Sequence, residues 1–327
     1  MSVSRLSLPV ATVLCLVTLV AASAGSTSAW SVEPQRTPPQ PVGFSLDRSD
    51  VSAGAQVTGV ISVVAEDEDR AVRVERMLPE GWVVVGSAVL PAAATEVRVP
   101  MPTGYFSTYS YRVSTVSEDT VVTSPEQALS VGPAYAPAGR PRDWSGGDVR
   151  FDPCAGPIRY VVNSGQAWPR ALAETAEAMR RIARATGLRF LRVGSTRVVP
   201  KGRASQRLPY GADLVIAWLR PGQTPLLTGG YVGQARSFTD SEGRITGAQV
   251  AINRNARVDL KRGFGAAPRR GTLLMHELTH AIGLGHVQRR TQVMYPNVAA
   301  VSSRFGAGDL AGLAHVGAQR GCQFTAG

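Results

Sequence analysis

Short apolar runs separated by turn residues dominate the chain between residues 43 and 132. The runs are rich in valine and other β-prone residues, and clusters of Asp, Gly, Pro and Ser lie between them. Repeated short strands with such turn signals are typical of an all-β sandwich. The predicted strands are Gln56–Val64, Ala71–Met77, Gly81–Val89, Thr95–Met101, Tyr109–Val116 and Thr120–Thr123.

After residue 150 the pattern changes to one in which strands and helices alternate. Ile158–Val162 predicts a strand, and Trp168–Thr186 predicts a helix whose apolar residues share one face and which Gly187 ends. This order predicts an α/β sandwich. Further predicted elements are strands Leu188–Val193, Ala212–Leu219, Tyr231–Phe238 and Gly247–Asn253, and a closing helix around Gly308–Val316.

The N-terminus has the pattern of a signal peptide. Arg5 is followed by an almost uncharged apolar run, Leu8–Ala22, which has the length of a signal-peptide core and is short for a membrane span. Small residues fit cleavage at Ala24 or at Ala29. We therefore predict a signal peptide over residues 1–29 and a secreted chain, the alternative being an N-terminal membrane anchor.

Two proline-rich stretches divide the rest of the chain. Residues 30–42 predict an extended spacer, and residues 133–150 predict a linker. The predicted domains are then 43–132 and 151–327. The first contains no His and no Cys, so we expect it to serve as a spacer, an adhesion module or a pro-region.

Composition and charge exclude several classes of protein. A hydrophobic fraction of 44% excludes a wholly disordered chain. The net charge is +11, and residues 136–327 hold 27 basic and 11 acidic side chains, which gives that half +16. The basic residues are scattered and form no aromatic-interleaved strip, so no nucleic-acid partner is expected. Attraction to an anionic cell-envelope polymer or an acidic substrate stays open.

Removal of the signal peptide would remove Cys15 and leave two cysteines. Cys154 and Cys322 form an even pair that brackets the second half of the chain. In an oxidising compartment we expect them to form a disulfide. The alternatives are two buried thiols, or a Cys154 that caps a metal.

The chemistry of the chain is concentrated in the run HELTHAIGLGH, residues 276–286. His276 and His280 are four residues apart on a predicted helix, so both project from one face and can bind one Zn²⁺. Glu277, adjacent to the first ligand, is placed to act as a general base. Gly283 permits a turn that brings His286 to the same metal. Three imidazoles with one open position predict a catalytic zinc site.

The spacing HExxHxxGxxH resembles that of the metzincin metallopeptidases, and Met294-Tyr295-Pro296 is similar to the methionine turn of their matrixin branch. The resemblance implies a twisted mixed sheet with an active-site helix and a C-terminal helix. It also implies His276, His280 and His286 as zinc ligands, Glu277 as the catalytic base and Met294 as the floor beneath the metal. Tyr295 and Pro296 would wall a substrate pocket, and the strand near 231–238 would pair with the substrate.

The chain departs from the matrixin pattern in two ways. Val287 stands where a small polar residue usually follows the third histidine, and residues 151–275 contain no histidine for a second, structural zinc. Asp213, Asp240 and Glu242 are candidate ligands of a calcium site, the alternative being that they are plain loop residues. His315, the remaining histidine, is expected to be structural or exposed.

The function predicted from these residues is that of a secreted, monomeric zinc endopeptidase with one Zn²⁺ and a peptide or protein substrate. The N-terminal domain resembles immunoglobulin-like or fibronectin-like sandwiches in architecture alone. Two other readings stay open: a secreted binding or adhesion protein with a vestigial metal site, and a zinc hydrolase acting on a cell-envelope polymer.

Overall fold

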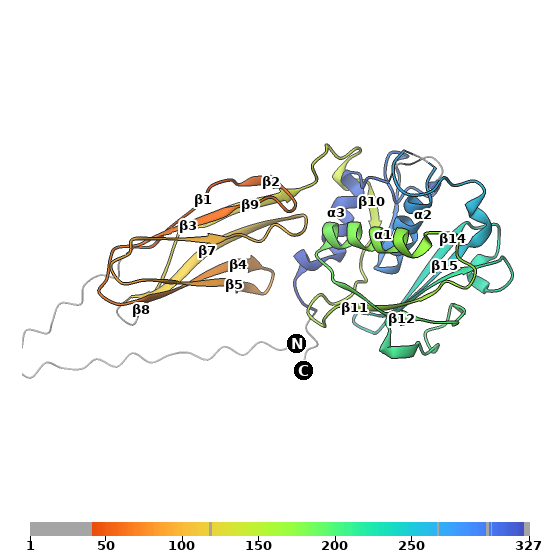
Figure 1. The fold of residues 1–327 in the computed structure, drawn as a ribbon, viewed down its shortest axis with the longest axis horizontal. Coiled ribbons are helices and arrows are strands. Elements are labelled where there is room, and N and C mark those ends of the chain that lie inside the picture. The colour runs from red at the N-terminus through yellow and green to blue at the C-terminus, as the bar shows by residue number, and fades with distance from the viewer. Residues whose placement is uncertain (1–40, 118–119, 267, 299–300, 302, 324–327) are drawn as a thin grey trace, which may run out of the picture. The chain divides into compact units, whose positions relative to one another are not determined.

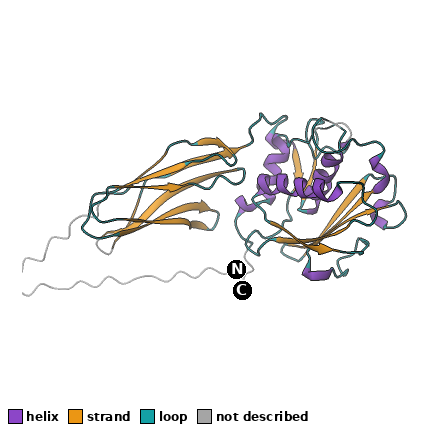
Figure 2. Ribbon diagram, in the orientation of Figure 1, coloured by secondary structure: helices purple, strands orange, loops and turns teal. Residues whose placement is uncertain are grey.

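A computed structural model of the chain describes residues 41–117, 120–266, 268–298, 301 and 303–323. The predicted signal peptide and the spacer up to residue 40 lie outside the described residues. Within the described part, no helix is long and apolar enough to cross a membrane. The strands and helices form a multidomain, β-rich protein (Figures 1 and 2), which confirms the coarse prediction of fold class.

Residues 43–132 form two β-sheets. Side chains alternate between buried and exposed along β4, as a two-layer packing requires, and the core between the sheets includes Ile61, Val72, Val113 and Leu129. The three-stranded sheet has the order β1 (Gly43–Leu46), β3 (Thr58–Ser62), β6 (Glu96–Pro100). The larger sheet has the order β2 (Asp50–Ser52), β9 (Gln127–Gly132), β7 (Ser107–Ser117), β4 (Arg70–Leu78), β5 (Gly81–Leu90), with β8 (Thr120–Thr123) paired to β7.

The second half of the chain is built around a five-stranded mixed sheet. All six residues of its central strand β13 are buried, which is typical of a strand covered on both faces. The other strands run parallel to β13 except β14, which is antiparallel to β15 and lies at the edge of the sheet. The order is β12 (Phe190–Ser195), β11 (Ile158–Asn163), β13 (Leu214–Leu219), β15 (Ile245–Asn253), β14 (Gly233–Thr239).

Three α-helices accompany this sheet: α1 (Ala171–Thr186), α2 (Arg270–Ala281) and α3 (Ala307–Val316) (Figure 1). Helix α1 ends at Gly187, whose φ of 73° is the left-handed conformation that glycine adopts without strain. The helix begins at Ala171 rather than at the predicted Trp168. Arg170 adopts a left-handed conformation before it, and the Trp168 indole donates to Glu174 instead.

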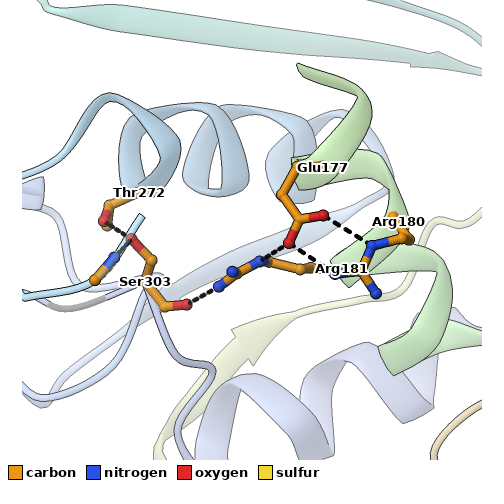
Figure 3. A network of polar contacts seen from close by, with 6 residues as sticks. Glu177, Arg180, Arg181, Thr272 and Ser303 are labelled. Carbon is orange, nitrogen blue, oxygen red and sulfur yellow. Dashed lines mark hydrogen bonds and ion pairs between the residues drawn. The ribbon is translucent and has the colours of Figure 1, made fainter. Parts of the chain in front are cut away.

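A polar network fastens α1 to the segment that leads into α3 (Figure 3). Glu177 accepts hydrogen bonds from Arg180 and Arg181 on its own helix. Arg181 donates in turn to the Ser303 carbonyl at 2.9 Å, and the Ser303 hydroxyl lies 2.6 Å from that of Thr272 on α2. Residues far apart in sequence are thereby held beside the helix that carries the histidines.

A small two-stranded sheet backs the loop that follows α2. Strand β10 (Trp144–Gly146), within the predicted linker, pairs antiparallel with β16 (Leu284–Val287). Gly283, between α2 and β16, has a φ of +106°, and a Cβ there would collide with the carbonyl of Val149. Glycine is therefore required where the chain turns back after the helix.

The predicted disulfide is confirmed. Cys154 and Cys322 are joined, with their Cα atoms 5.3 Å apart. The bond closes a loop over a sequence separation of 168 residues, so the two ends of the C-terminal half are tied together. The sulfur of Cys154 is therefore not free to cap a metal.

Candidate metal centre

Helix α2 places two histidines on one face and fixes the orientation of both rings. His276 Nδ1 is hydrogen-bonded to the carbonyl of Val293 at 2.8 Å, and His280 Nδ1 to the carbonyl of Leu284 at 2.7 Å. Since a carbonyl only accepts, both Nδ1 atoms carry the proton. Each Nε2 then presents a lone pair, which is the form that binds a metal.

The third histidine reaches the same point from β16. His280 Nε2 lies 3.1 Å from His276 Nε2 and 3.1 Å from His286 Nε2. A tetrahedral ion with bonds of about 2.0–2.1 Å holds its ligand nitrogens roughly 3.3 Å apart, close to these separations. The three residues thus form a possible metal site, as the sequence predicts.

Burial favours the neutral form of these rings, which is the form that binds a cation. It lowers the pKa of His276 to about 3 and that of His280 to about 4, and it lowers the pKa of the more exposed His286. The imidazoles of His276 and His280 are therefore neutral at pH 7. Three lone pairs that face one another gain nothing from each other, whereas a single cation satisfies all three.

Glu277 is buried beside this centre. Burial raises its pKa to about 8. Its carboxylate lies against the start of β14, because a Cβ at Gly233 would come within 2.7 Å of Oε1. The carboxyl group therefore faces the cleft next to the histidines, and a cation there would favour its ionised, proton-accepting form.

The turn that carries Met294 is held by Asp309, a residue not predicted from the sequence. Met294 is fully buried. Asp309 of α3 accepts hydrogen bonds from the backbone N–H groups of Val293 (2.7 Å), Met294 (3.0 Å) and Gly306 (2.8 Å). Burial raises the pKa of Asp309 to about 6, although the three donors act in the opposite direction.

Gln292 completes this support. Its side-chain oxygen accepts from the N–H groups of Gly308 and Asp309 at the start of α3, and its amide nitrogen donates to Asp143 at 3.1 Å. One local signal could have indicated Asp309, since an acidic residue in the first turn of a helix commonly caps free N–H groups. No local signal indicates Gln292.

A cleft of about 640 Å³ opens over the histidines. Its walls come from β14, from the loop and strand after α2, from residues 146–149 of the predicted linker, and from the segment after Met294. Pro296 and Val298 line this cleft. Tyr295 is not among the lining residues; it packs against the hydrophobic core instead.

The other candidate ligands lie elsewhere. Among the described residues, no metal-binding cluster includes Asp213, Asp240 or Glu242. Asp240 is ion-paired with Arg244 in its own turn, whereas Asp213 accepts the N–H of Arg159 from a distant part of the chain, so both carboxylates hold backbone structure. His315 packs against the ring of Trp144, with 4.8 Å between centroids, and is no part of the three-histidine site.

Comparison with known proteins leaves the family open. No family model matches the chain, and no curated protein matches it. Solved structures resemble about three tenths of the chain. A chain from a study of T-cell activation by the bacterial superantigen toxic shock syndrome toxin-1 has 14% identity and a TM-score of 0.23, with 28% of this chain and 99% of that chain covered. A CARDB domain from Pyrococcus furiosus, crystallised with two metal ions, has 11% identity and a TM-score of 0.23 over 28% of this chain and 94% of its own.

A third structural relative is the sporulation control protein Spo0M from Bacillus subtilis. It has 9% identity and a TM-score of 0.22, and the match covers 30% of this chain and 51% of that protein. Likenesses at these TM-scores support no assignment of family or activity.

Proposed function

We propose that the chain is a secreted zinc-dependent endopeptidase of the metzincin class, similar to its matrixin branch. One observation carries the proposal: three Nε2 atoms converge within a cleft that the buried Glu277 also lines. Nitrogen-only ligation with an open fourth position is typical of catalytic zinc. Calcium and magnesium prefer oxygen ligands, which this set lacks.

The edge strand β14 supports a peptide as the substrate. Asn253 N–H donates to the carbonyl of Val232 at 2.9 Å. In an antiparallel pair, residues that hydrogen-bond to the partner strand alternate with residues that do not. Val232 is of the bonded kind, so the backbone N–H and C=O groups of Gly233, Ala235 and Ser237 point away from β15. All three residues line the cleft. An extended peptide laid there would gain backbone hydrogen bonds as an added strand.

The reaction proposed is hydrolysis of a peptide bond within a chain. Zinc supplies a Lewis acid that polarises the scissile carbonyl and makes a nearby water more acidic. Glu277 accepts a proton from the attacking water at a carboxylate oxygen and delivers it to the departing amine. The carbonyls of Val293 and Leu284 keep the histidine rings in the required tautomer throughout.

The proposal is tested with the purified full chain, metal analysis and a set of internally quenched peptides. We expect one zinc per chain, hydrolysis at internal bonds, loss of hydrolysis in a chelator and its return on addition of Zn²⁺. Hydrolysis that persists after metal removal has been verified would contradict the mechanism. Failure of the zinc-loaded chain to cleave any peptide or protein would overturn the function.

A further inference from the structure

One wall of the cleft is a short segment, Gly146–Val149. On one side it is held by β16, since Gly146 pairs with Leu284 and the Ser145 hydroxyl donates to the carbonyl of His286 at 2.7 Å. The segment is thus attached directly to the strand that carries the third histidine.

On its other side the same segment is held by the turn between β14 and β15. Arg150 N–H donates to the carbonyl of Gly243 at 3.2 Å, and Ile245 N–H donates to the carbonyl of Arg150 at 2.8 Å. Backbone bonds on both flanks make Gly146–Val149 a fixed wall, so a side chain on it keeps a defined position relative to the cleft.

Asp148 is the exposed acidic residue of this wall. The residues that line the cleft include no lysine or arginine, and their other carboxylate belongs to the buried Glu277. Among the described residues, no basic side chain forms an ion pair with Asp148 within 4.0 Å. The cleft therefore presents a carboxylate without an ion-pair partner, in a half of the chain whose net charge is +16 from 27 basic and 11 acidic residues.

The basic groups that act on His315 together with Asp148 have other partners. Arg150 is buried, and its guanidinium donates to the carbonyls of Gly321 and Arg320. The Arg320 guanidinium lies 2.9 Å from His315, whose pKa is lowered, chiefly by burial. A lysine or arginine brought in by a ligand would thus meet a free carboxylate.

We propose that Asp148 selects substrates with a lysine or arginine at one fixed distance from the scissile bond. This inference rests on the proposed endopeptidase function and names its substrate class. The wall that carries Asp148 lies by the β14–β15 turn, whereas Glu277 lies by Gly233 at the opposite end of β14. The ends of β14 are six residues apart, which at roughly 3.3 Å per extended residue is about 20 Å. The basic side chain therefore belongs within about six positions of the bond that is cut.

The test uses the zinc-loaded full chain and matched peptides that carry Lys, Gln or Glu at each of these positions on either side of the bond. We expect kcat/KM for the Lys peptide to exceed that for the Gln peptide by roughly threefold to tenfold at one position, and the Glu peptide to be poorest there. In Asp148→Asn the Lys-to-Gln ratio should fall to about one, and in Asp148→Lys the Glu peptide should become the better substrate. Asp259→Asn, which neutralises an exposed carboxylate outside the cleft, is the matched control and should keep the wild-type ratio.

The outcomes separate the two proposals. Cleavage of the Gln peptide reports on the endopeptidase function, and the ratio between peptides reports on Asp148. A wild-type chain that cleaves all three peptides equally well, or an Asp148→Asn variant that keeps the Lys preference, would overturn the inference and leave the endopeptidase function standing. A wild-type chain that cleaves none of them would overturn both.

Discussion

Asp309 shows how one buried side chain can support a candidate metal site that it does not touch. Its carboxylate binds the N–H groups of Val293 and Met294, and the carbonyl of that same Val293 orients His276. The position of the first histidine ring therefore depends on a residue of α3. A change at residue 309 should reach the metal through the backbone alone.

We predict that Asp309→Ala lowers the free energy of unfolding by about 2–4 kcal/mol, because three buried N–H groups lose their acceptor. Zinc affinity should fall by roughly tenfold to a hundredfold, as is usual for partners that orient ligands. Denaturant unfolding and competitive metal titration measure the two effects. Asp309→Asn keeps one acceptor, so its free energy of unfolding should lie between those of Asp309→Ala and the wild type. An Asp309→Ala variant with unchanged stability would contradict this role.

Glu277 and its histidine neighbours should give different signatures when replaced. Glu277→Gln keeps the size of the side chain but cannot accept a proton at neutral pH, so we expect kcat/KM to fall by about 10²–10⁴-fold while zinc stays bound. His280→Ala should lose both zinc and activity. Metal analysis beside peptide assays distinguishes the two, and a Glu277→Gln protein without metal would mean that Glu277 acts as a ligand.

At the scale of elements, the edge strand β14 combines two sets of backbone groups with different tasks. The backbone groups of Gln234 and Arg236 bond to β15, and those of Gly233, Ala235 and Ser237 point away from it. A proline removes one N–H, so its effect depends on which of the two sets the replaced residue belongs to.

Ala235→Pro should therefore reduce kcat/KM for peptides by roughly threefold to tenfold, the equivalent of one hydrogen bond, with little change in melting temperature. Gln234→Pro removes an N–H that faces β15 and should lower the melting temperature instead. Quenched-peptide kinetics and thermal unfolding of both variants test this. The opposite assignment of effects would show that the substrate does not pair with β14.

The helices and strands with clear apolar patterns and the candidate metal ligands could be predicted from local sequence. The residues that support them through distant contacts could not. Strand β13 is a continuous apolar run and α1 has a clear apolar face, so both were predicted within a few residues. Short strands such as β1 and β9 contain few β-branched residues and were missed. Strand β10 falls within the predicted linker, because its partner, β16, lies far along the chain and local sequence does not indicate the pairing.

The candidate site was likewise predictable only where its residues lie close together in the sequence. His276, His280, Glu277 and His286 lie within eleven residues, so their spacing alone indicates a shared metal. Gln292 supports the site through contacts that only the folded chain creates, and only the fold brings Asp148 to the wall of the cleft. Tyr295 shows the converse, since its place beside Pro296 did not bring it into the cleft.

At the scale of the whole molecule, the disulfide links the first and last parts of the C-terminal half. We predict that Cys154→Ser with Cys322→Ser lowers the free energy of unfolding by about 3–5 kcal/mol, since the crosslink restricts a long loop in the unfolded chain. Urea unfolding of the double variant and of the oxidised wild type measures the difference. At low temperature the variant should still bind zinc, because neither cysteine contacts the histidines; equal stability of the two proteins would contradict the prediction.

The pairing of β10 with β16 affects where the C-terminal half could be separated from the rest of the chain by recombination. Ala138 accepts the N–H of Ala307 at 2.7 Å, and Asp143 binds Gln292, so the stretch before residue 150 supports α3 and the Met294 turn. Recombination that carried only residues 151–327 into another gene would leave part of the metal centre behind. The portable unit begins near residue 137, and an exon or module boundary that respects the chemistry should fall before it.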